Sequence, residues 1–423
     1  MVSSFIFLLL ISNVTAQQLI SLSSLKGGNV PNYLKNEEAC GLYVSANSDD
    51  DAILANITVT SDDVTRTLLD QKYRTISITS GFLLPYPIQP NATFTTNLDT
   101  EKLARLQGVL YYTTAKQLQS NLFFVYNVNQ DEYFNIKGTE NHTVVFLNTN
   151  PNWSTKISNW EQDRDAMVYI YQGIPQDSIE PINTHLFSNP MHSNGFDGFF
   201  ENVEPFSMSN VAFYMKVWSR CSFTFGPGKV FLDGTTTTAY TTTGFYQKPL
   251  GEIDTMTKIN TMRDIKSLGL IGANILGHVP NGGSVTFLVE DGENVYGQST
   301  IPTDFFAPWS TPNVGNDIVI NSTNSQNGQY YVQYCVVQGP GPNTSEAPSS
   351  STTSTSEAST SSVTDSSAAP SSTVTEISAT KTSAPTRHSP TSTTTIKSIE
   401  TTTKLSVSKS PILMVIAFIV MVF

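Results

Sequence analysis

Apolar and polar side chains alternate along most of the chain between residues 17 and 342. The alternating segments are rich in Val, Ile, Thr, Tyr and Phe, which favour pleated strands, and Gly, Pro, Asn and Asp cluster between them. The pattern therefore predicts a mainly β fold of layered antiparallel sheets, similar to a sandwich. The predicted strands are 56–61, 75–80, 92–97, 108–114, 121–128, 142–149, 166–173, 211–225, 284–292, 316–323 and 329–338.

Only residues 98–107 and 256–269 have helical periodicity, and we expect helices there. The strands between 57 and 114 recur every 16 to 18 residues, so a β-solenoid is the alternative fold, although no repeated motif accompanies the spacing. Asn, Pro and Gly gather in 174–205, where we place a weak boundary within the globular region.

Both ends of the chain carry targeting patterns. The apolar run FIFLLLI and the short side chains of Val14-Thr15-Ala16 predict a signal peptide over 1–16, cleaved before Gln17. The tail over 411–423 contains an uncharged apolar run of 12 residues, Ile412 to Phe423, which is shorter than the roughly 20 residues of an ordinary transmembrane helix. Such a tail after a polar spacer is typical of a GPI-attachment signal, and Ser398 is the predicted attachment residue.

Residues 343–410 separate the globular region from this tail. They hold 39 Ser or Thr among 68 residues, with four prolines and no aromatic residue. Such a segment cannot bury enough apolar surface to fold, and its composition is typical of an O-glycosylated stalk.

A signal peptide, a globular domain over 17–342, a Ser/Thr-rich stalk and a GPI tail, in this order, resemble the GPI-anchored cell-wall glycoproteins of yeasts and other fungi. The resemblance covers 97 of 423 residues and is compositional. It implies a place on the extracellular face of the plasma membrane through a GPI lipid, or covalently in the cell wall. It also implies a partner among cell-wall polysaccharides or cell-surface glycans. The class includes adhesins, wall-remodelling glycanases, aspartic proteases and structural mannoproteins, so it indicates place more than activity.

The formal net charge of −12 falls entirely on residues 17–342, because five acidic and five basic residues of the stalk cancel. Phosphate repels an acidic domain, and no basic patch is visible, which argues against nucleic acid as a partner. A secreted, tethered chain is also a poor candidate for a cytosolic metabolic enzyme.

Six N-glycosylation sequons follow the signal peptide, and each predicts an exposed asparagine. The predicted acceptors are Asn56, Asn91, Asn141, Asn152, Asn321 and Asn343.

Three cysteines allow three pairings, of which we favour a disulfide between Cys40 and Cys335. It would enclose 294 residues, and in the chain-entropy model it could stabilise the fold by up to about 5 kcal/mol. Alternation through VWSRCSFTF places Val217, Cys221 and Phe223 on one face, so we expect Cys221 to be buried as a small hydrophobic residue.

Glu252 and Asp254 in GEIDTM resemble the opening of the E-x-D-x-E signature of β-glucanases and wall transglycosylases. That signature presents catalytic carboxylates on one face of a strand. The third carboxylate is missing here, because Met256 or Thr257 stands in its place, and we expect an ordinary turn or strand edge.

Other candidates for chemistry have simpler interpretations. Asp49–Asp51 and Asp62–Asp63 could offer calcium ligands, but their spacing does not fit an EF-hand, and we expect solvated turns. His185 and His192 lack a third metal ligand nearby and are expected at the surface. Tryptophan rings can stack on sugars, although we expect one of the four, Trp218, in the core. The four are Trp153, Trp160, Trp218 and Trp309.

We therefore predict no catalytic residue, metal or cofactor, and a structural or adhesive role at the cell surface. The alternative hypothesis is a wall-remodelling glycoside hydrolase or transglycosylase that uses an unrecognised carboxylate pair, with Glu252 as the first residue to test.

Overall fold

The computed structural model describes residues 17–34, 38–75, 81–150, 152–176, 180, 184–193, 196–279, 282–301, 305–307 and 313–339. All of them lie in one compact unit, Met1–Ser349. The predicted signal peptide, Asn343, the stalk, Ser398 and the tail lie outside the described residues.

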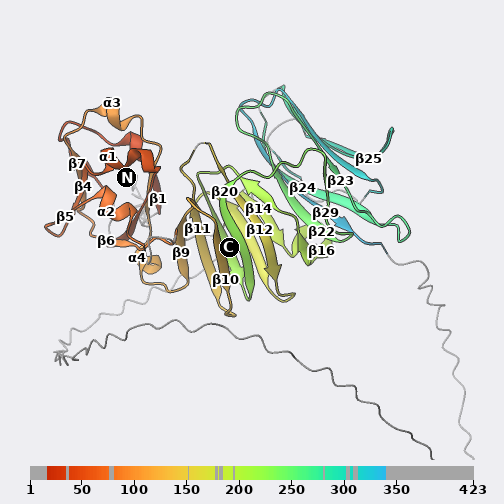
Figure 1. Cartoon of the computed structure of the whole chain (residues 1–423), viewed down its shortest axis with the longest axis horizontal. Helices are drawn as coiled ribbons and strands as arrows, with labels where there is room; N and C mark the ends of the chain where they lie inside the picture. Colours follow the sequence, from red (N-terminus) through yellow and green to blue (C-terminus); the bar gives the residue numbers. More distant parts are fainter. Residues whose placement is uncertain are drawn as a thin grey trace, which may run out of the picture. The chain divides into compact units, whose positions relative to one another are not determined.

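Strands dominate the fold, and most of them belong to six sheets that pack in pairs as three sandwiches (Figure 1). The first sandwich pairs a sheet in the order β1-β8-β3-β6 with one in the order β2-β7-β4-β5. Leu42 and Val44 of one sheet pack with Ile57 and Phe94 of the other in a single buried cluster. The strands are β1 (Gln18–Ser21), β2 (Asn32–Tyr33), β3 (Cys40–Ser45), β4 (Ile57–Ser61), β5 (Val64–Thr67), β6 (Tyr86–Ile88), β7 (Thr93–Thr96) and β8 (Val109–Tyr112).

Short helices occur only among the first strands in the described part of the chain. Where caps form, the chain supplies Ser, Thr or Asp: Thr67 caps one helix in a capping box, and Asp99 accepts the backbone N–H of Lys102 at 2.8 Å in another. The helices are η1 (Leu22–Ser24), η2 (Ser48–Asp50), α1 (Asp51–Leu54), α2 (Leu68–Lys72), α3 (Thr100–Leu103) and α4 (Ala115–Leu118).

The middle sandwich has an aromatic core. Phe146 and Phe213 stack at 4.9 Å between ring centroids, and Phe225 of the facing sheet approaches Phe146 edge-on at 5.0 Å. Its sheets have the orders β14-β13-β19-β11-β9 and β10-β20-β12-β18. The strands are β9 (Phe123–Asn127), β10 (Glu132–Ile136), β11 (Asn141–Leu147), β12 (Ser154–Gln162), β13 (Met167–Gln172), β14 (His185–Asn189), β18 (Phe206–Met208), β19 (Ala212–Trp218) and β20 (Cys221–Gly228).

The third sandwich pairs the orders β17-β22-β29-β24-β27 and β21-β23-β28-β25-β26, and β15 and β16 form a separate hairpin. Ile275 and Val332 of one sheet share a buried cluster with Phe287 and Ile320 of the other. The strands are β15 (Met191–Ser193), β16 (Phe196–Gly198), β17 (Asn202–Val203), β21 (Thr235–Thr236), β22 (Thr242–Gln247), β23 (Thr255–Asn260), β24 (Leu270–His278), β25 (Ser284–Asp291), β26 (Asn294–Ile301), β27 (Phe305–Ala307), β28 (Asp317–Thr323) and β29 (Gln329–Val337).

The sandwiches also pack on one another. Tyr43 and Tyr111, on the second face of the first sheet, share a cluster with Val145 and Leu147 of the middle sandwich. The sheet that contains β3 is therefore covered on both faces, and all six residues of β3 are buried. A strand covered on both faces loses the apolar–polar alternation, which explains why the pattern of alternation missed β3.

The predicted fold class of layered antiparallel sheets is confirmed, whereas one predicted helix is wrong. Residues 256–269 begin in strand β23, which pairs along its length with β28 and buries Thr257 and Ile259 in alternation. Pairing with a neighbouring strand overrides a weak helical periodicity. The stretch 174–205 contains β14 to β17, after which β18 to β20 return the chain to the middle sandwich.

Candidate functional site

A cleft of about 740 Å³ is lined by three connections between strands. One follows β11 and contributes Asn148, Thr149, Asn150 and Trp153. A second follows β20 and contributes Lys229 to Asp233, and a third follows β22 and contributes Pro249, Leu250 and Glu252. Its size lies within the range of small-ligand pockets, roughly 300–1,000 Å³.

Hydrogen bonds within the protein hold the polar lining of this cleft. Asn148 donates from Nδ2 to the carbonyl oxygen of Trp153 at 3.1 Å, and Gln247 accepts the backbone N–H of Ser209 at 2.8 Å. The hydroxyls of Ser154 and Ser209 lie 2.8 Å apart. Asn148 is 4% exposed and uses both of its N–H donors within the protein. Gln247 and Ser209 are only half-buried, so their amide and hydroxyl can bind a polar ligand at a reduced cost in side-chain entropy.

Large apolar side chains surround these polar groups and face solvent. The exposed fraction is 52% for Trp153, 80% for Phe231 and 65% for Leu250. Exposed aromatic rings beside fixed amides and hydroxyls suit sugars, because a pyranose offers one apolar face and a rim of hydroxyl groups.

The cleft also contains Lys229, Asp233 and Glu252. Both carboxylates are exposed, and Asp233 accepts the backbone N–H of Lys258 at 3.3 Å. Glu252 lies in the connection between β22 and β23, so no strand presents it together with Asp254. Asp254 instead accepts the backbone N–H of Asn324 at 2.7 Å, which agrees with the interpretation of the motif as a turn.

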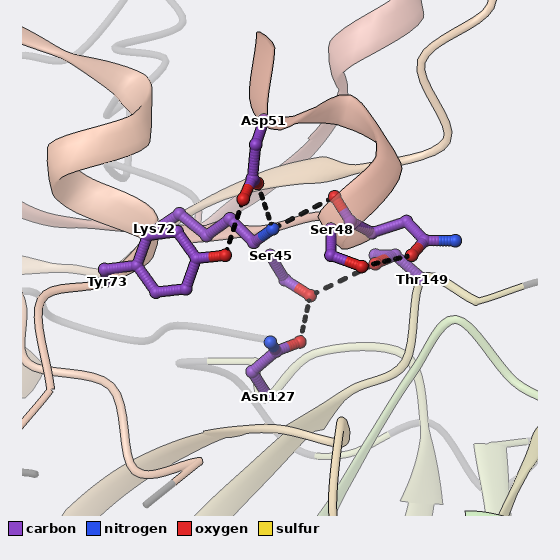
Figure 2. A network of polar contacts seen from close by, with 8 residues as sticks. Ser45, Ser48, Asp51, Lys72, Tyr73, Asn127 and Thr149 are labelled. Atoms are coloured by element: carbon purple, nitrogen blue, oxygen red, sulfur yellow. Dashed lines mark hydrogen bonds and ion pairs between the residues drawn. The ribbon is translucent and has the colours of Figure 1, made fainter. Parts of the chain in front are cut away.

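A second cavity of about 520 Å³ adjoins the first sandwich and is lined by Ser48, Lys72, Asn127 and Asn129, among others. Figure 2 shows the polar network beside it. The ammonium of Lys72 lies 2.5 Å from Asp51 Oδ1 and donates to the carbonyl oxygen of Asn47 at 3.0 Å.

Two neighbours complete this network (Figure 2). The phenol of Tyr73 donates to Asp51 Oδ2 at 2.6 Å, and this bond, more than burial, raises the pKa of Tyr73. Ser45 donates to Asn127 Oδ1 at 2.7 Å and thereby fixes the orientation of that amide.

The acidic runs have structural roles. Asp51 pairs with Lys72, and burial raises the pKa of Asp50 beside it. Asp62 and Asp63 are the two turn residues of the β4–β5 hairpin, and both have positive φ, as such a turn requires. Among the described residues, no group of three or more His, Cys, Asp or Glu side chains is placed to hold a metal ion.

His185 and His192 meet at the ring of Tyr169, with centroid separations of 5.6 and 5.9 Å. Burial lowers the pKa of His185 to about 4, and His192 hydrogen-bonds Asp197 at 2.8 Å. His192 is exposed, as expected, whereas His185 is half-buried.

The tryptophans differ in environment. Trp160 is buried in the middle core, and Trp153 is exposed at the cleft. Trp218, expected in the core, is half-buried and contacts Tyr169 edge-on at 5.5 Å. Trp309 lies outside the described residues.

The predicted disulfide between Cys40 and Cys335 does not form in the structure. Each described cysteine lies in a different buried cluster: Cys40 in the first sandwich, Cys221 in the middle one, and Cys335 with Met191 and Phe200. The predicted burial of Cys221 is confirmed, since it packs in one cluster with Phe223. Burial raises the pKa of the Cys221 and Cys335 thiols, which makes both poor nucleophiles.

The described sequon asparagines are all exposed, as glycan acceptors must be. Four of them lie away from the linings of both cavities, whereas Asn152 immediately precedes Trp153. These exposed asparagines are Asn56, Asn91, Asn141, Asn152 and Asn321.

Sequence reasoning missed Asp233, Phe231 and Lys72 as candidate site residues. Phe231 and Asp233 carry the only available signal, which is an apolar and an acidic residue in a Gly-rich connection. The burial of Lys72 beside Asp51 has no sequence signal, because 21 positions separate the two.

A family model described as "Transmembrane glycoprotein" matches residues 37–422. No curated protein matches the sequence. None of the helices that the structure describes has the length and apolar character needed to cross a membrane.

Solved structures give only weak similarities. The CUB1-EGF-CUB2 domains of rat MASP-1 are 8% identical with a TM-score of 0.18, over 50% of this chain and 99% of that one. The extracellular region of zebrafish Gpr126/Adgrg6 is 7% identical with a TM-score of 0.18, over 52% and 34%. A triple jelly roll protein of an archaeal virus is 10% identical with a TM-score of 0.17, over 76% and 84%. At these scores none of them bears on the function of this chain.

Proposed function

Since this chain belongs to the transmembrane glycoprotein family, we propose that it is a surface glycoprotein whose β domain binds glycans. In this proposal its role is structural or adhesive rather than catalytic. A GPI lipid attached near Ser398 tethers it to the extracellular face of the membrane.

The cleft beside Trp153 is the observation that supports glycan binding. It combines exposed aromatic rings at Trp153 and Phe231 with the amide of Gln247 and the hydroxyl of Ser209, which hydrogen bonds hold in place. Cell-wall polysaccharides and cell-surface glycans present the matching chemistry, apolar sugar faces bordered by hydroxyl groups.

The test of binding uses the full chain purified in detergent and glycan fragments from β-glucan, chitin and mannan. We expect saturable binding of at least one class by calorimetry, weakened about tenfold by Trp153→Ala, because one stacked ring accounts for about 1.4 kcal/mol. Tyr133→Ala is the matched control, since Tyr133 is 63% exposed and lines neither cavity. Equal loss in both variants would count against the cleft as the site.

The tether is tested separately on intact cells with a phosphatidylinositol-specific phospholipase. We expect the enzyme to release the chain into the medium, because the apolar tail is replaced by a lipid that the enzyme cleaves. A chain that spans the bilayer would stay in the membrane fraction, and this result would overturn the GPI proposal while leaving glycan binding intact.

A glycoside hydrolase or transglycosylase is the second candidate, because the same cleft places two carboxylates, Asp233 and Glu252, among sugar-binding groups. Both are exposed, and an exposed carboxyl lacks the apolar surroundings that make a general acid at neutral pH. Incubation with oligosaccharides should therefore give no new chain lengths. Products that disappear in Glu252→Gln but persist in Glu293→Gln, an exposed glutamate outside the cleft, would reverse this ranking.

A further inference from the structure

The two cavities share one wall. Asn150 and Trp153, in the connection between β11 and β12, line both of them. Trp153 is 52% exposed and contributes to the lining of both cavities. A ligand stacked on the ring of Trp153 is therefore next to both cavities.

The second cavity is lined by polar groups that do not require a charged ligand. Asp51 pairs with the ammonium of Lys72, so a bound anion is not needed to neutralise it. Asn127 and Asn129 supply amides, and Ser48 supplies a hydroxyl. Neutral hydroxyl groups are the ligand chemistry that such a lining fits.

We propose that the ligand is a neutral linear oligosaccharide that spans both cavities and stacks one sugar unit on Trp153. The cavities measure about 740 and 520 Å³, and each is large enough by itself for a small ligand. Two such volumes that share one aromatic residue accommodate a chain of units better than a single terminal sugar. This inference rests on the proposed glycan binding and adds the length of the ligand.

The experiment measures affinity against chain length by calorimetry. It uses the full chain in detergent, with Asn152→Gln as the background so that no sugar on Asn152 reaches the groove beside Trp153. The probes are β-glucan, chitin and mannan oligomers of about two to about eight units. We expect Kd to fall with length until both cavities are filled and then to level off.

Three substitutions distinguish the contributions of the two cavities, which together form the proposed groove. Trp153→Ala should weaken binding about tenfold at every length, and Phe231→Ala, in the first cavity only, should do so for short and long oligomers alike. Asn129→Ala, which changes the second cavity only, should weaken the binding of long oligomers about fivefold and leave the binding of short oligomers unchanged. Asn129 is exposed, so this variant should keep its circular dichroism spectrum.

The outcomes separate the two proposals. Absence of binding for every oligomer overturns glycan binding itself, and the inference with it. Binding that is independent of length, with Asn129→Ala unchanged for the longest oligomer, overturns the two-cavity ligand and leaves glycan binding standing.

Discussion

The buried ammonium of Lys72 should make the first sandwich depend on Asp51. Lys72 is 5% exposed, Asp51 is 31% exposed, and their charged atoms lie 2.5 Å apart. Asp51→Asn keeps the shape but removes the charge that compensates the ammonium, and its single amide oxygen replaces the two oxygens that accept from Lys72 and Tyr73. Lys72→Met removes the other charge and leaves a carboxylate that reaches water.

The two variants should lower the free energy of unfolding by different amounts. Removing one partner of a fully buried pair costs about 3–5 kcal/mol. Because Asp51 is 31% exposed, we expect the low end, about 3 kcal/mol of unfolding free energy, for Asp51→Asn. We expect about 1 kcal/mol or less for Lys72→Met, since a partly solvated carboxylate tolerates the loss. The double variant should match Lys72→Met.

The three cysteines provide the assay, because each lies in a different buried cluster. Pulsed alkylation in rising urea, followed by peptide mapping, reports the opening of each cluster separately. With a urea slope of roughly 1–3 kcal/mol/M, the labelling midpoint of Cys40 in Asp51→Asn should fall by about 1–3 M. The midpoints of Cys221 and Cys335 should stay in place.

Two results would refute this reasoning. If Asp51→Asn and Lys72→Met cost the same, the ammonium does not depend on Asp51 for compensation. If all three cysteines shift together in Asp51→Asn, the unit opens as a whole, and the pair does not act on the first sandwich alone.

Three further predictions concern the rest of the fold. Thiol titration should find almost none reactive in the native chain and three in the denatured chain, because Cys40, Cys221 and Cys335 are buried and form no disulfide; a count of one would restore a bridge. The pKa of His185 is lowered to about 4, so the unfolded chain binds more protons between pH 6.5 and 4, and stability should fall as pH falls through that window. His185→Gln should flatten the slope of the urea midpoint against pH. An unchanged slope would mean that the pH dependence comes from other groups. Phe146→Ala should cost about 3–5 kcal/mol by the Cys221 labelling midpoint, since it empties the centre of the aromatic core; a loss below about 1 kcal/mol would mean that the core collapses around the gap.

Alternation in the sequence predicted strands such as β19 and β20 but missed β3, which is buried on both faces. The segment 211–225 alternates clearly, and it folds into β19 and β20 with Val217, Cys221 and Phe223 in one cluster. The segment 40–45 does not alternate, because Tyr43 enters one cluster while Leu42 and Val44 enter another. Alternation measures the burial of one face, so a strand between two layers falls outside its reach.

The candidate site was less predictable than the fold, because its parts are distant in sequence. Trp153, Phe231 and Glu252 come from three connections, and no spacing rule relates them before the sheets are paired. Only the chemistry of single residues was available, and it marked Trp153 as a side chain able to stack on sugars without showing that Trp153 lines a cleft. The same reasoning gave Trp160 the same ability to stack on sugars, although Trp160 is buried in the middle core.

Charge narrows the class of ligand that can use the groove. The globular region carries the whole net charge of −12, and an acidic surface repels anionic polymers over distances of about a Debye length, roughly 8 Å at physiological salt. Lys72, a buried cation that lines the second cavity, is already paired with Asp51 and so does not offset this repulsion. Anionic glycans therefore meet a barrier that neutral ones do not. If the groove binds sugar, neutral polymers should be preferred, and the preference should weaken as salt screens the repulsion.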